Sequence, residues 1–514
     1  MRLISLSLLL LASIGYAQDS LIYYHELQFE SDLEESYFNE LYNGNTENLF
    51  EAFYAPYEGD LTLIHNEKHS YQYQVGGIHL IKRPKNQNKY VKKLYDELHE
   101  RLLRKYEDLV FFDRIFEDGV YNCVTACAIY GLTFEQLGIP YTIKETPTHV
   151  YLVAFPGDDQ VIIETTDPVN GFQSFSPVFK QQYVSLLEQQ KIIDRAELSQ
   201  GVSAIFNKYY YSSSEVNLVQ LAGLQYYNKA VESFNAKKYD LAVTNFEKAF
   251  LLYNSDQTRQ MLFASLSMVV SGSSYTNDFD VESLGKISRF NMYDITNAEV
   301  VGEFGRITQK QLLSNNDTAT YSRSYQILME RIPEDSMLQR DISFLYYYER
   351  ARILYNRAMF DEALPFALKA YESKPESIDS ESLLLSCYTD SYRDDEAAQA
   401  LVRLEKFMVD FPALKRNNRF GAIWSNLYLV NMYDNYLSKN YQKAFEFKKS
   451  FEELISQYSN YPYDRRIAGS AYSQVVAYYF RRGQKQSARN ALDQGFKYAP
   501  GNGELKTRQY MLNR

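Results

Sequence analysis

The sequence predicts a multidomain protein in which an α+β domain with a reactive thiol precedes an all-helical region. Three observations indicate this order. Cys123 lies at the predicted start of a helix, and two strand-like runs that carry a histidine and a glutamate follow it. Beyond residue 215, small and apolar residues recur at fixed offsets. The chain has 514 residues, which is long enough for two or three domains with full cores.

The first residues predict export. Residues 1–17 contain one basic residue, an apolar run too short to span a bilayer, and small residues at Gly15 and Ala17. This arrangement is typical of a signal peptide that is cut after Ala17. No cysteine follows the cut to take a lipid anchor, and no later stretch has the length of a transmembrane helix. We therefore expect an exported protein, periplasmic or extracellular, without a transmembrane segment.

Charge and cysteine content exclude several classes of protein. The net charge of −11 and the pI near 5.3 argue against nucleic acid or an anionic membrane surface as a partner. Three cysteines are too few for a disulfide scaffold, and Cys387 lies in an apolar run typical of a core helix. His65, His69 and His79 lack accompanying cysteines or an acidic ligand pattern, so we expect no metal and no cofactor.

Residues 119–140 predict a loop that opens a helix. Asn122 is a capping residue, apolar and small residues follow at helical spacing, and Gly138 with a nearby proline stops the helix. Cys123 therefore lies in the first turn, where unpaired N–H groups and the helix dipole favour a thiolate. Cys127 is the alternative nucleophile. It lies one turn deeper, where apolar surroundings keep a thiol protonated.

Two strand-like runs follow this helix. Residues 149–155 begin with His149 and alternate β-branched and aromatic side chains. Residues 160–168 form the second run after Pro-Gly-Asp-Asp, a turn sequence that predicts an antiparallel hairpin. The second run carries Glu164 and Asp167, which are three residues apart and so point to opposite faces of a strand. At most one of them can face the histidine.

The order of these residues resembles the transglutaminase-like superfamily, whose core is similar to papain. The shared pattern is a helix-opening cysteine, Gly-Ile-Pro after the helix, a histidine on a strand and an acid on the next, over residues 60–185. The resemblance implies Cys123 as nucleophile, His149 as base and Glu164 as the group that orients the imidazole. The family often has Asp followed by Pro and Thr at the third position, and here Asp167 precedes a proline. Glu164 lies closer to the usual spacing from the histidine, so Asp167 is the alternative.

Strand alternation also favours Glu164 as the third residue. Facing the imidazole, it would share its side with Ile162 and Thr166, while Val161 and Ile163 would pack into the core. Facing the other way, Glu164 would be a buried carboxylate without an evident partner, which is costly.

This constellation suits attack on an amide. The thiol needs a base or an imidazolium that holds the thiolate, and the imidazole must then protonate the leaving amine. We therefore expect an exported cysteine peptidase, amidase or acyl transferase that acts on a protein or peptide substrate. Transfer to water and transfer to a lysine amine are both open. The alternative is a catalytically inactive scaffold protein of the cell envelope.

Upstream of the thiol, residues 90–106 predict a helix with one buried face. This face consists of Val91, Leu94, Leu98 and Leu102. His99 lies on the same helix beside charged residues, so we expect its side chain in solvent.

An internal repeat begins near residue 215. In each copy a small residue is followed, four positions later, by an apolar or small residue. A further apolar or small residue follows three positions after that. Three copies carry these offsets: Ala242, Phe246 and Ala249; Ala363, Ala367 and Ala370; Ala488, Leu492 and Gly495. The pattern resembles the tetratricopeptide repeat, a helix–turn–helix unit whose stacked copies form a curved solenoid that can bind a protein partner. We expect a transglutaminase-like domain over residues 18–200, helical in its N-terminal part, and repeats over 215–514.

Overall fold

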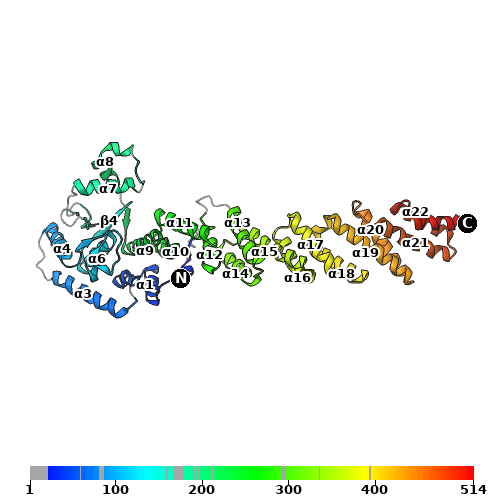
Figure 1. Ribbon diagram of the computed structural model, residues 1–514, viewed down its shortest axis with the longest axis horizontal. Coiled ribbons are helices and arrows are strands. Elements are labelled where there is room, and N and C mark those ends of the chain that lie inside the picture. Colours follow the sequence, from blue (N-terminus) through cyan, green and yellow to red (C-terminus); the bar gives the residue numbers. More distant parts are fainter. Residues whose placement is uncertain are drawn as a thin grey trace, which may run out of the picture. The chain divides into compact units, whose positions relative to one another are not determined.

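The computed structural model describes residues 21–57, 59–79, 86–157, 160–166, 177–189, 191–194, 196–210, 214–290, 297–334, 336–392 and 395–513. Most of these residues are helical, and a small sheet lies in the N-terminal part of the chain (Figure 1). Backbone contacts divide the chain into two compact units. The first is Met1–Glu303 with Thr318–Pro333, and the second is Phe304–Asp317 with Glu334–Arg514.

Two of the sequence predictions fall on residues outside the described ranges. These are the signal peptide at residues 1–17 and the alternative acid Asp167. Within the described ranges, no helix combines the length and the apolar character needed to cross a membrane.

Helix α6, Cys123–Leu137, lies at the centre of the first unit. The side chain of Asn122 accepts a hydrogen bond from the N–H of Thr125 at 2.9 Å, and the hydroxyl of Thr125 accepts one from the N–H of Asn122 at 3.0 Å. Gly138 ends the helix in the left-handed conformation, with φ of 64°. The predicted start of this helix at Cys123 is confirmed.

A four-stranded antiparallel sheet packs against α6 (Figure 1). Its strands, in spatial order, are β5 (Val161–Ile163), β4 (His149–Ala154), β3 (Tyr141–Thr146) and β6 (Ser214–Val216). Strands β4 and β5 form the predicted hairpin, with Leu152 opposite Ile163.

Different elements cover the two faces of this hairpin. Val161 and Ile163 are fully buried in the core around α6, as strand alternation predicts. On the other face, Tyr151 and Val153 pack against helices α7 (Pro177–Gln189) and α8 (Val202–Tyr210). The hairpin is therefore held between α6 and the pair α7 and α8.

The helix predicted over residues 90–106 is α4, Gln87–Arg101. Its predicted apolar face is buried. The helix ends earlier than predicted because Lys105 and Tyr106 form the short strand β1, which pairs in parallel with β2, Val120–Tyr121. This pairing places residues 105–106 beside the chain that leads into Cys123.

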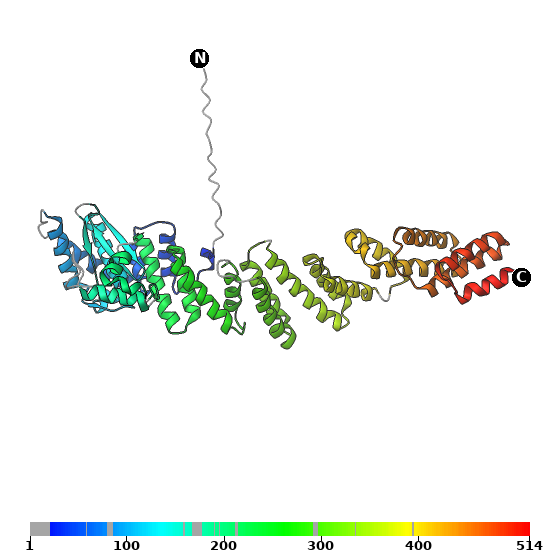
Figure 2. The same cartoon turned by 90° about the horizontal axis from the view of Figure 1, so that it is seen from above.

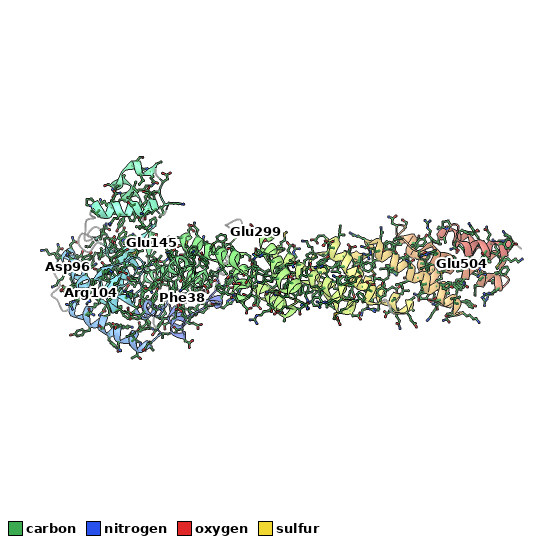
Figure 3. All side chains as sticks on the ribbon, in the orientation of Figure 1. Phe38, Asp96, Arg104, Glu145, Glu299 and Glu504 are labelled. Atoms are coloured by element: carbon green, nitrogen blue, oxygen red, sulfur yellow. The ribbon has the colours of Figure 1, made fainter. Side chains whose placement is uncertain are left out.

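The N-terminal segment, residues 21–42, lies against helices from much further along the chain. Glu34 of α1 (Asp32–Tyr42) forms a fully buried ion pair with Lys248 of α10 (Tyr239–Leu252), at 2.8 Å. Glu26 of η1 (Tyr24–Glu26) pairs with Arg289, which follows α12 (Asp278–Ile287), at 2.7 Å. Phe38, labelled in Figure 3, packs edge-on against Tyr226 of α9 (Leu218–Asn235). Helices α9 and α10 are therefore part of the first unit.

Four helical hairpins share one turn geometry. They are α9–α10 in the first unit and, in the second, α15 (Met337–Asn356) with α16 (Phe360–Ser373), α19 (Asn418–Leu437) with α20 (Tyr441–Gln457), and α21 (Arg465–Arg481) with α22 (Lys485–Tyr498). Each turn has one residue with φ between 59° and 73°: Lys237, Ala358, Lys439 and Gly483. The next residue caps the second helix with ψ between 62° and 72°.

The repeated small and apolar residues lie inside these hairpins. Ala242, Ala363 and Ala488 are fully buried near the start of the second helix of their hairpins. A Cβ atom added at Gly495 would lie about 3.0 Å from Tyr472 of the facing helix, so the offsets mark positions where two helices approach closely. Figure 2 shows the helices of the second unit side by side as hairpins. The repeated pattern therefore corresponds to a helical-repeat architecture.

The remaining described elements connect or extend these parts. They are α2 (Leu49–Tyr54), α3 (Leu61–His79), α5 (Arg114–Glu117), η2 (Glu197–Gln200), α11 (Asp256–Gly272), α13 (Asn297–Ile307), the π-helical η4 (Thr308–Ser314), α14 (Thr318–Arg331), α17 (Ile378–Ser391), α18 (Ala397–Asp410), η5 (Pro412–Arg416) and α23 (Gly503–Asn513).

Candidate active site

The structure brings Cys123, His149 and Glu164 together. The Nε2 atom of His149 lies 2.8 Å from Oε1 and 2.7 Å from Oε2 of Glu164. The thiol of Cys123 is close enough to the imidazole to raise its pKa. Because Nε2 faces the carboxylate, Nδ1 is the ring nitrogen left for the thiol. The imidazole therefore lies between the thiol and the carboxylate.

Secondary structure fixes the place of each of these side chains. Cys123 is the first residue of α6, His149 is the first residue of β4, and Glu164 follows β5 directly. The thiol is partly exposed, whereas the imidazole is 9% exposed and the carboxylate is fully buried. The cysteine therefore lies nearer the surface than the shielded ion pair of His149 and Glu164.

The carboxylate of Glu164 is held by further donors on both oxygens. Oε1 accepts hydrogen bonds from the N–H of Thr166 at 2.9 Å and from its hydroxyl at 2.6 Å. Oε2 accepts a hydrogen bond from the hydroxyl of Tyr210 at 2.5 Å. Thr166 thus lies on the side of Glu164, as strand alternation predicts. These donors let the carboxylate remain ionised although it is fully buried.

The charges of the pair follow from these contacts. Burial opposes the charged imidazole, but the adjacent Glu164 carboxylate and the Cys123 thiol raise the pKa of His149 to about 10. Burial would likewise raise the pKa of Glu164, yet His149, Thr166 and Tyr210 together hold it below its ordinary value. At neutral pH the pair is therefore an imidazolium beside a carboxylate, and a thiolate at Cys123 would have a cation next to it.

The other two cysteines have different surroundings. Cys127 is fully buried, and burial raises its pKa well above the ordinary value. Cys387 of α17 is also fully buried, and burial together with Asp390 raises its pKa to about 12. All three cysteines are free thiols. Cys123 alone among them exposes part of its side chain, which favours it over Cys127 as the nucleophile.

The expectation that His99 lies in solvent is wrong. Its Nε2 lies 3.3 Å from the carbonyl oxygen of Thr165, and its Nδ1 lies 3.1 Å from the hydroxyl of Tyr130. Burial lowers its pKa. Tyr95, one turn earlier, donates its hydroxyl to the carbonyl oxygen of Glu164 at 3.1 Å. Helix α4 therefore holds the backbone that carries the acid. Tyr95 stacks on His99, and the spacing of four residues between these two rings is the sequence signal that could have indicated a packed imidazole.

Sequence reasoning also missed Tyr210. This residue ends α8, and its hydroxyl reaches Glu164 across 46 residues of sequence. No local pattern links the two, because the contact depends on how α8 packs on the sheet. The carboxylate therefore has a partner outside residues 60–185.

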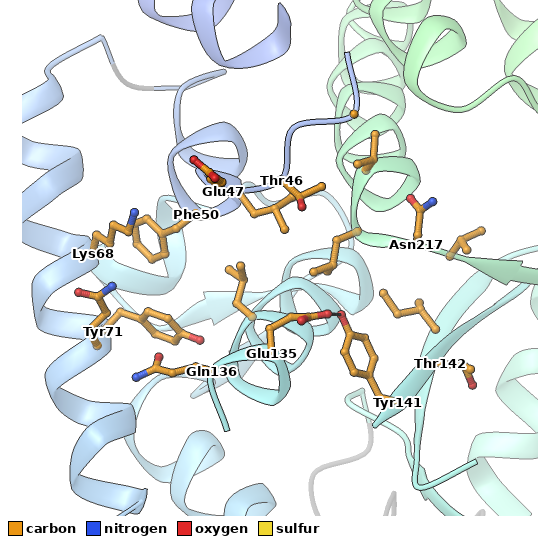
Figure 4. Close-up of a pocket in the computed structure, with 18 of the residues that line it drawn as sticks. Thr46, Glu47, Phe50, Lys68, Tyr71, Glu135, Gln136, Tyr141, Thr142 and Asn217 are labelled. Atoms are coloured by element: carbon orange, nitrogen blue, oxygen red, sulfur yellow. Dashed lines mark hydrogen bonds between the residues drawn. The ribbon is translucent and has the colours of Figure 1, made fainter. Parts of the chain in front are cut away.

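A cavity of about 880 Å³ lies near the opposite end of α6 (Figure 4). Glu135, which lines it, is twelve residues beyond Cys123, a rise of roughly 18 Å along the helix. Among the charged residues that line it, Glu135 accepts a hydrogen bond from Tyr141 at 3.0 Å, Lys68 pairs with Glu51 at 2.5 Å and Glu215 pairs with Lys144 at 2.5 Å. The cavity is separate from the thiol site.

Among the described residues, no three His, Cys, Asp or Glu side chains gather in a way that could hold a metal ion.

No model of a known protein family matches the chain, and no curated protein sequence matches it.

Proposed function

We propose that this protein is a transglutaminase-like cysteine enzyme that acts on amide bonds as a peptidase, amidase or acyl transferase. One observation carries the proposal. A partly exposed cysteine at a helix start lies beside an imidazole whose Nε2 atom lies against a buried carboxylate. This is the arrangement that holds a thiolate and keeps an imidazole in one orientation for proton transfer.

In the first step, the thiolate of Cys123 attacks the carbonyl carbon of the amide. A C–S bond forms, and the carbonyl electron pair moves to the oxygen. The N–H of Thr125 is held by the side chain of Asn122, but the N–H groups of Cys123 and Val124 precede the first helical hydrogen bond and can donate to this oxyanion. The positive end of the helix dipole acts in the same direction.

In the second step, His149 gives its Nδ1 proton to the leaving nitrogen as the C–N bond breaks. The acyl group remains on the sulfur as a thioester. Water or an amine then attacks the thioester, His149 takes the proton of the attacking group, and the C–S bond breaks to restore the thiolate. Glu164 keeps the imidazole in place and stabilises its positive charge throughout.

The proposal also covers location and partners. Residues 1–17 would direct export, so the substrate would be a periplasmic or extracellular protein or peptide. The helical hairpins would be tetratricopeptide-like repeats that bind a protein partner. The reaction itself requires no cofactor.

Labelling of Cys123 with iodoacetamide tests the proposal. We expect fast labelling of Cys123 at pH 7 and slow labelling of Cys387. His149→Ala should slow the labelling of Cys123 strongly, because the thiolate loses its adjacent cation. His65→Ala, at an exposed position on α3, is the matched control and should leave the rate unchanged. If Cys123 reacts like an ordinary thiol in all three proteins, the catalytic proposal is wrong and the inactive scaffold is favoured.

A further inference from the structure

Tyr210 contributes a buried hydrogen bond to the candidate site. Its hydroxyl donates to Oε2 of Glu164 at 2.5 Å, and both side chains are fully buried. A hydrogen bond from a hydroxyl to an ionised carboxylate is among the stronger ones in proteins, and burial strengthens it further. Tyr210 lies beyond residue 185, so the resemblance to the transglutaminase-like superfamily assigns it no role.

Aromatic packing fixes the direction of this hydroxyl. The ring of Tyr210 stacks on Tyr151 of β4 at 4.7 Å and on Phe206 of α8 at 4.5 Å, and Tyr183 of α7 meets it edge-on at 5.3 Å. Tyr151 is two residues after His149 on the same face of β4. The strand that carries the imidazole therefore also helps to hold the tyrosine.

The two oxygens of Glu164 have different external donors. Thr166 is two residues away and binds Oε1, whereas Tyr210 comes from a distant helix and binds Oε2. With both donors in place, rotation of the carboxylate breaks at least one strong hydrogen bond. Without the tyrosine hydroxyl, Oε2 would keep only its contact with His149 among the described residues, and the carboxylate could turn about its last side-chain bond.

We propose that Tyr210 is a positioning residue, which acts through Glu164 to keep the imidazole of His149 directed at Cys123. The inference rests on the proposed function and extends it to the α7 and α8 pair. Tyr210 contacts neither the sulfur nor the substrate in this role. It makes the orientation of the imidazole depend on the packing of α8 against β4.

Two tyrosines that are adjacent on α8 provide a matched comparison. Tyr210→Phe removes the hydrogen bond to Glu164 and keeps the ring. Tyr209→Phe also removes a tyrosine-to-carboxylate hydrogen bond, from the hydroxyl of Tyr209 to Glu197 at 3.0 Å. This bond is only partly buried. The assay is the rate of iodoacetamide labelling of Cys123 in the full chain from pH 5 to 10.

Tyr210→Phe should slow labelling at pH 7 about tenfold, the effect of one hydrogen bond to a charged group. The labelling rate should also begin to increase at a higher pH than in wild type. A poorly held carboxylate stabilises the imidazolium less, so the thiolate of Cys123 loses its counter-charge. Tyr209→Phe should leave both the rate and the profile unchanged. In a Glu164→Gln background, Tyr210→Phe should add little, since the tyrosine acts through the carboxylate.

Equal profiles for Tyr210→Phe and Tyr209→Phe overturn the inference. Full additivity of Tyr210→Phe and Glu164→Gln also overturns it. Labelling of the buried Cys127 reports whether each variant is folded. If Tyr210→Phe exposes Cys127, a fluorinated tyrosine at position 210 keeps the ring and changes the donor strength, and it must still shift the profile.

A spectroscopic readout separates this inference from the proposed function. The imidazole of His149 can be titrated by NMR whether or not the thiol reacts. Tyr210→Phe should shift this titration and Tyr209→Phe should not. If wild-type Cys123 shows no dependence on His149 but the titration shifts, the proposed function fails and the positioning contact stands. If the titration is unchanged, the positioning role fails.

Discussion

Glu164→Gln changes the charge of the buried site and keeps its shape. The amide nitrogen of glutamine can take the place of Oε2, because the hydroxyl of Tyr210 can turn and accept a hydrogen bond. The N–H of Thr166 cannot accept, so the amide oxygen stays in the place of Oε1 and still meets both Thr166 and His149. The substitution therefore removes the negative charge beside the imidazolium and the acceptor that Oε2 offers to Nε2 of His149.

The decrease in the reactivity of Cys123 can be estimated from the charged hydrogen bond between His149 and Glu164 that the substitution removes. A hydrogen bond to a charged group contributes about 1.5–3 kcal/mol. At 1.36 kcal/mol for each tenfold change, this corresponds to a decrease of about 10- to 150-fold in the reactivity of Cys123 at pH 7. The upper part of this range is expected, since the Glu164 side chain is fully buried and His149 meets it within 2.8 Å on both oxygens.

The assay is thiol-dependent turnover together with labelling of Cys123, in Glu164→Gln and in Asp167→Asn. We expect Asp167→Asn to be the milder substitution. The reverse ranking, with Cys127 still protected in both variants, would assign the third role to Asp167. A change of less than about threefold in both variants would refute the reasoning and favour the inactive scaffold.

Three further predictions use the buried cysteines or the N-terminus as reporters. The pKa of His149 is raised, so the contribution of its protonation to stability is full below about pH 6.5 and is lost as the pH rises toward about 10. The urea concentration that exposes Cys127 should therefore differ between wild type and Glu164→Gln at pH 6.5. At pH 10 the two proteins should need nearly the same urea concentration. Gly421→Ala should destabilise the second unit by about 1–3 kcal/mol, measured from urea-induced labelling of Cys387, because an added Cβ would lie 2.3 Å from the ring of Tyr461. Gly503→Ala, where a Cβ meets open space, is its control, and equal effects would contradict the packing argument. N-terminal sequencing of secreted protein should give Gln18 as the first residue, and a chain that still starts at Met1 would reject the signal peptide.

Local signals predicted the centre of the first unit well. The limits of α6 depend on Asn122 and Gly138, whose capping roles are properties of single residues and their immediate neighbours. The hairpin of β4 and β5 follows from alternation and from one turn sequence. Strand alternation also placed Val161 and Ile163 in the core. These features need little information about the rest of the chain.

The remaining contacts depend on packing between distant segments. Strand β6 joins the sheet beside β3 only because the chain returns after α8, and neither strand has a sequence pattern that predicts it. His99 was expected in solvent because its sequence neighbours are charged, yet the helix turns it toward Thr165. Tyr210 is one of many tyrosines in the chain, and only the packing of α8 identifies it as the partner of Glu164.

The ion pairs of the N-terminal segment also determine when the first unit can finish folding. Glu34 is separated from Lys248 by 214 residues, and Glu26 from Arg289 by 263. Synthesis at roughly 5–20 residues per second leaves a delay of roughly 10–40 s before Lys248 follows Glu34 out of the ribosome. During this interval the acidic segment has no counter-charge to bury, and closing so long a loop is slow. The first unit is therefore completed late, and a nascent chain that stops before Arg289 leaves Glu26 without this partner.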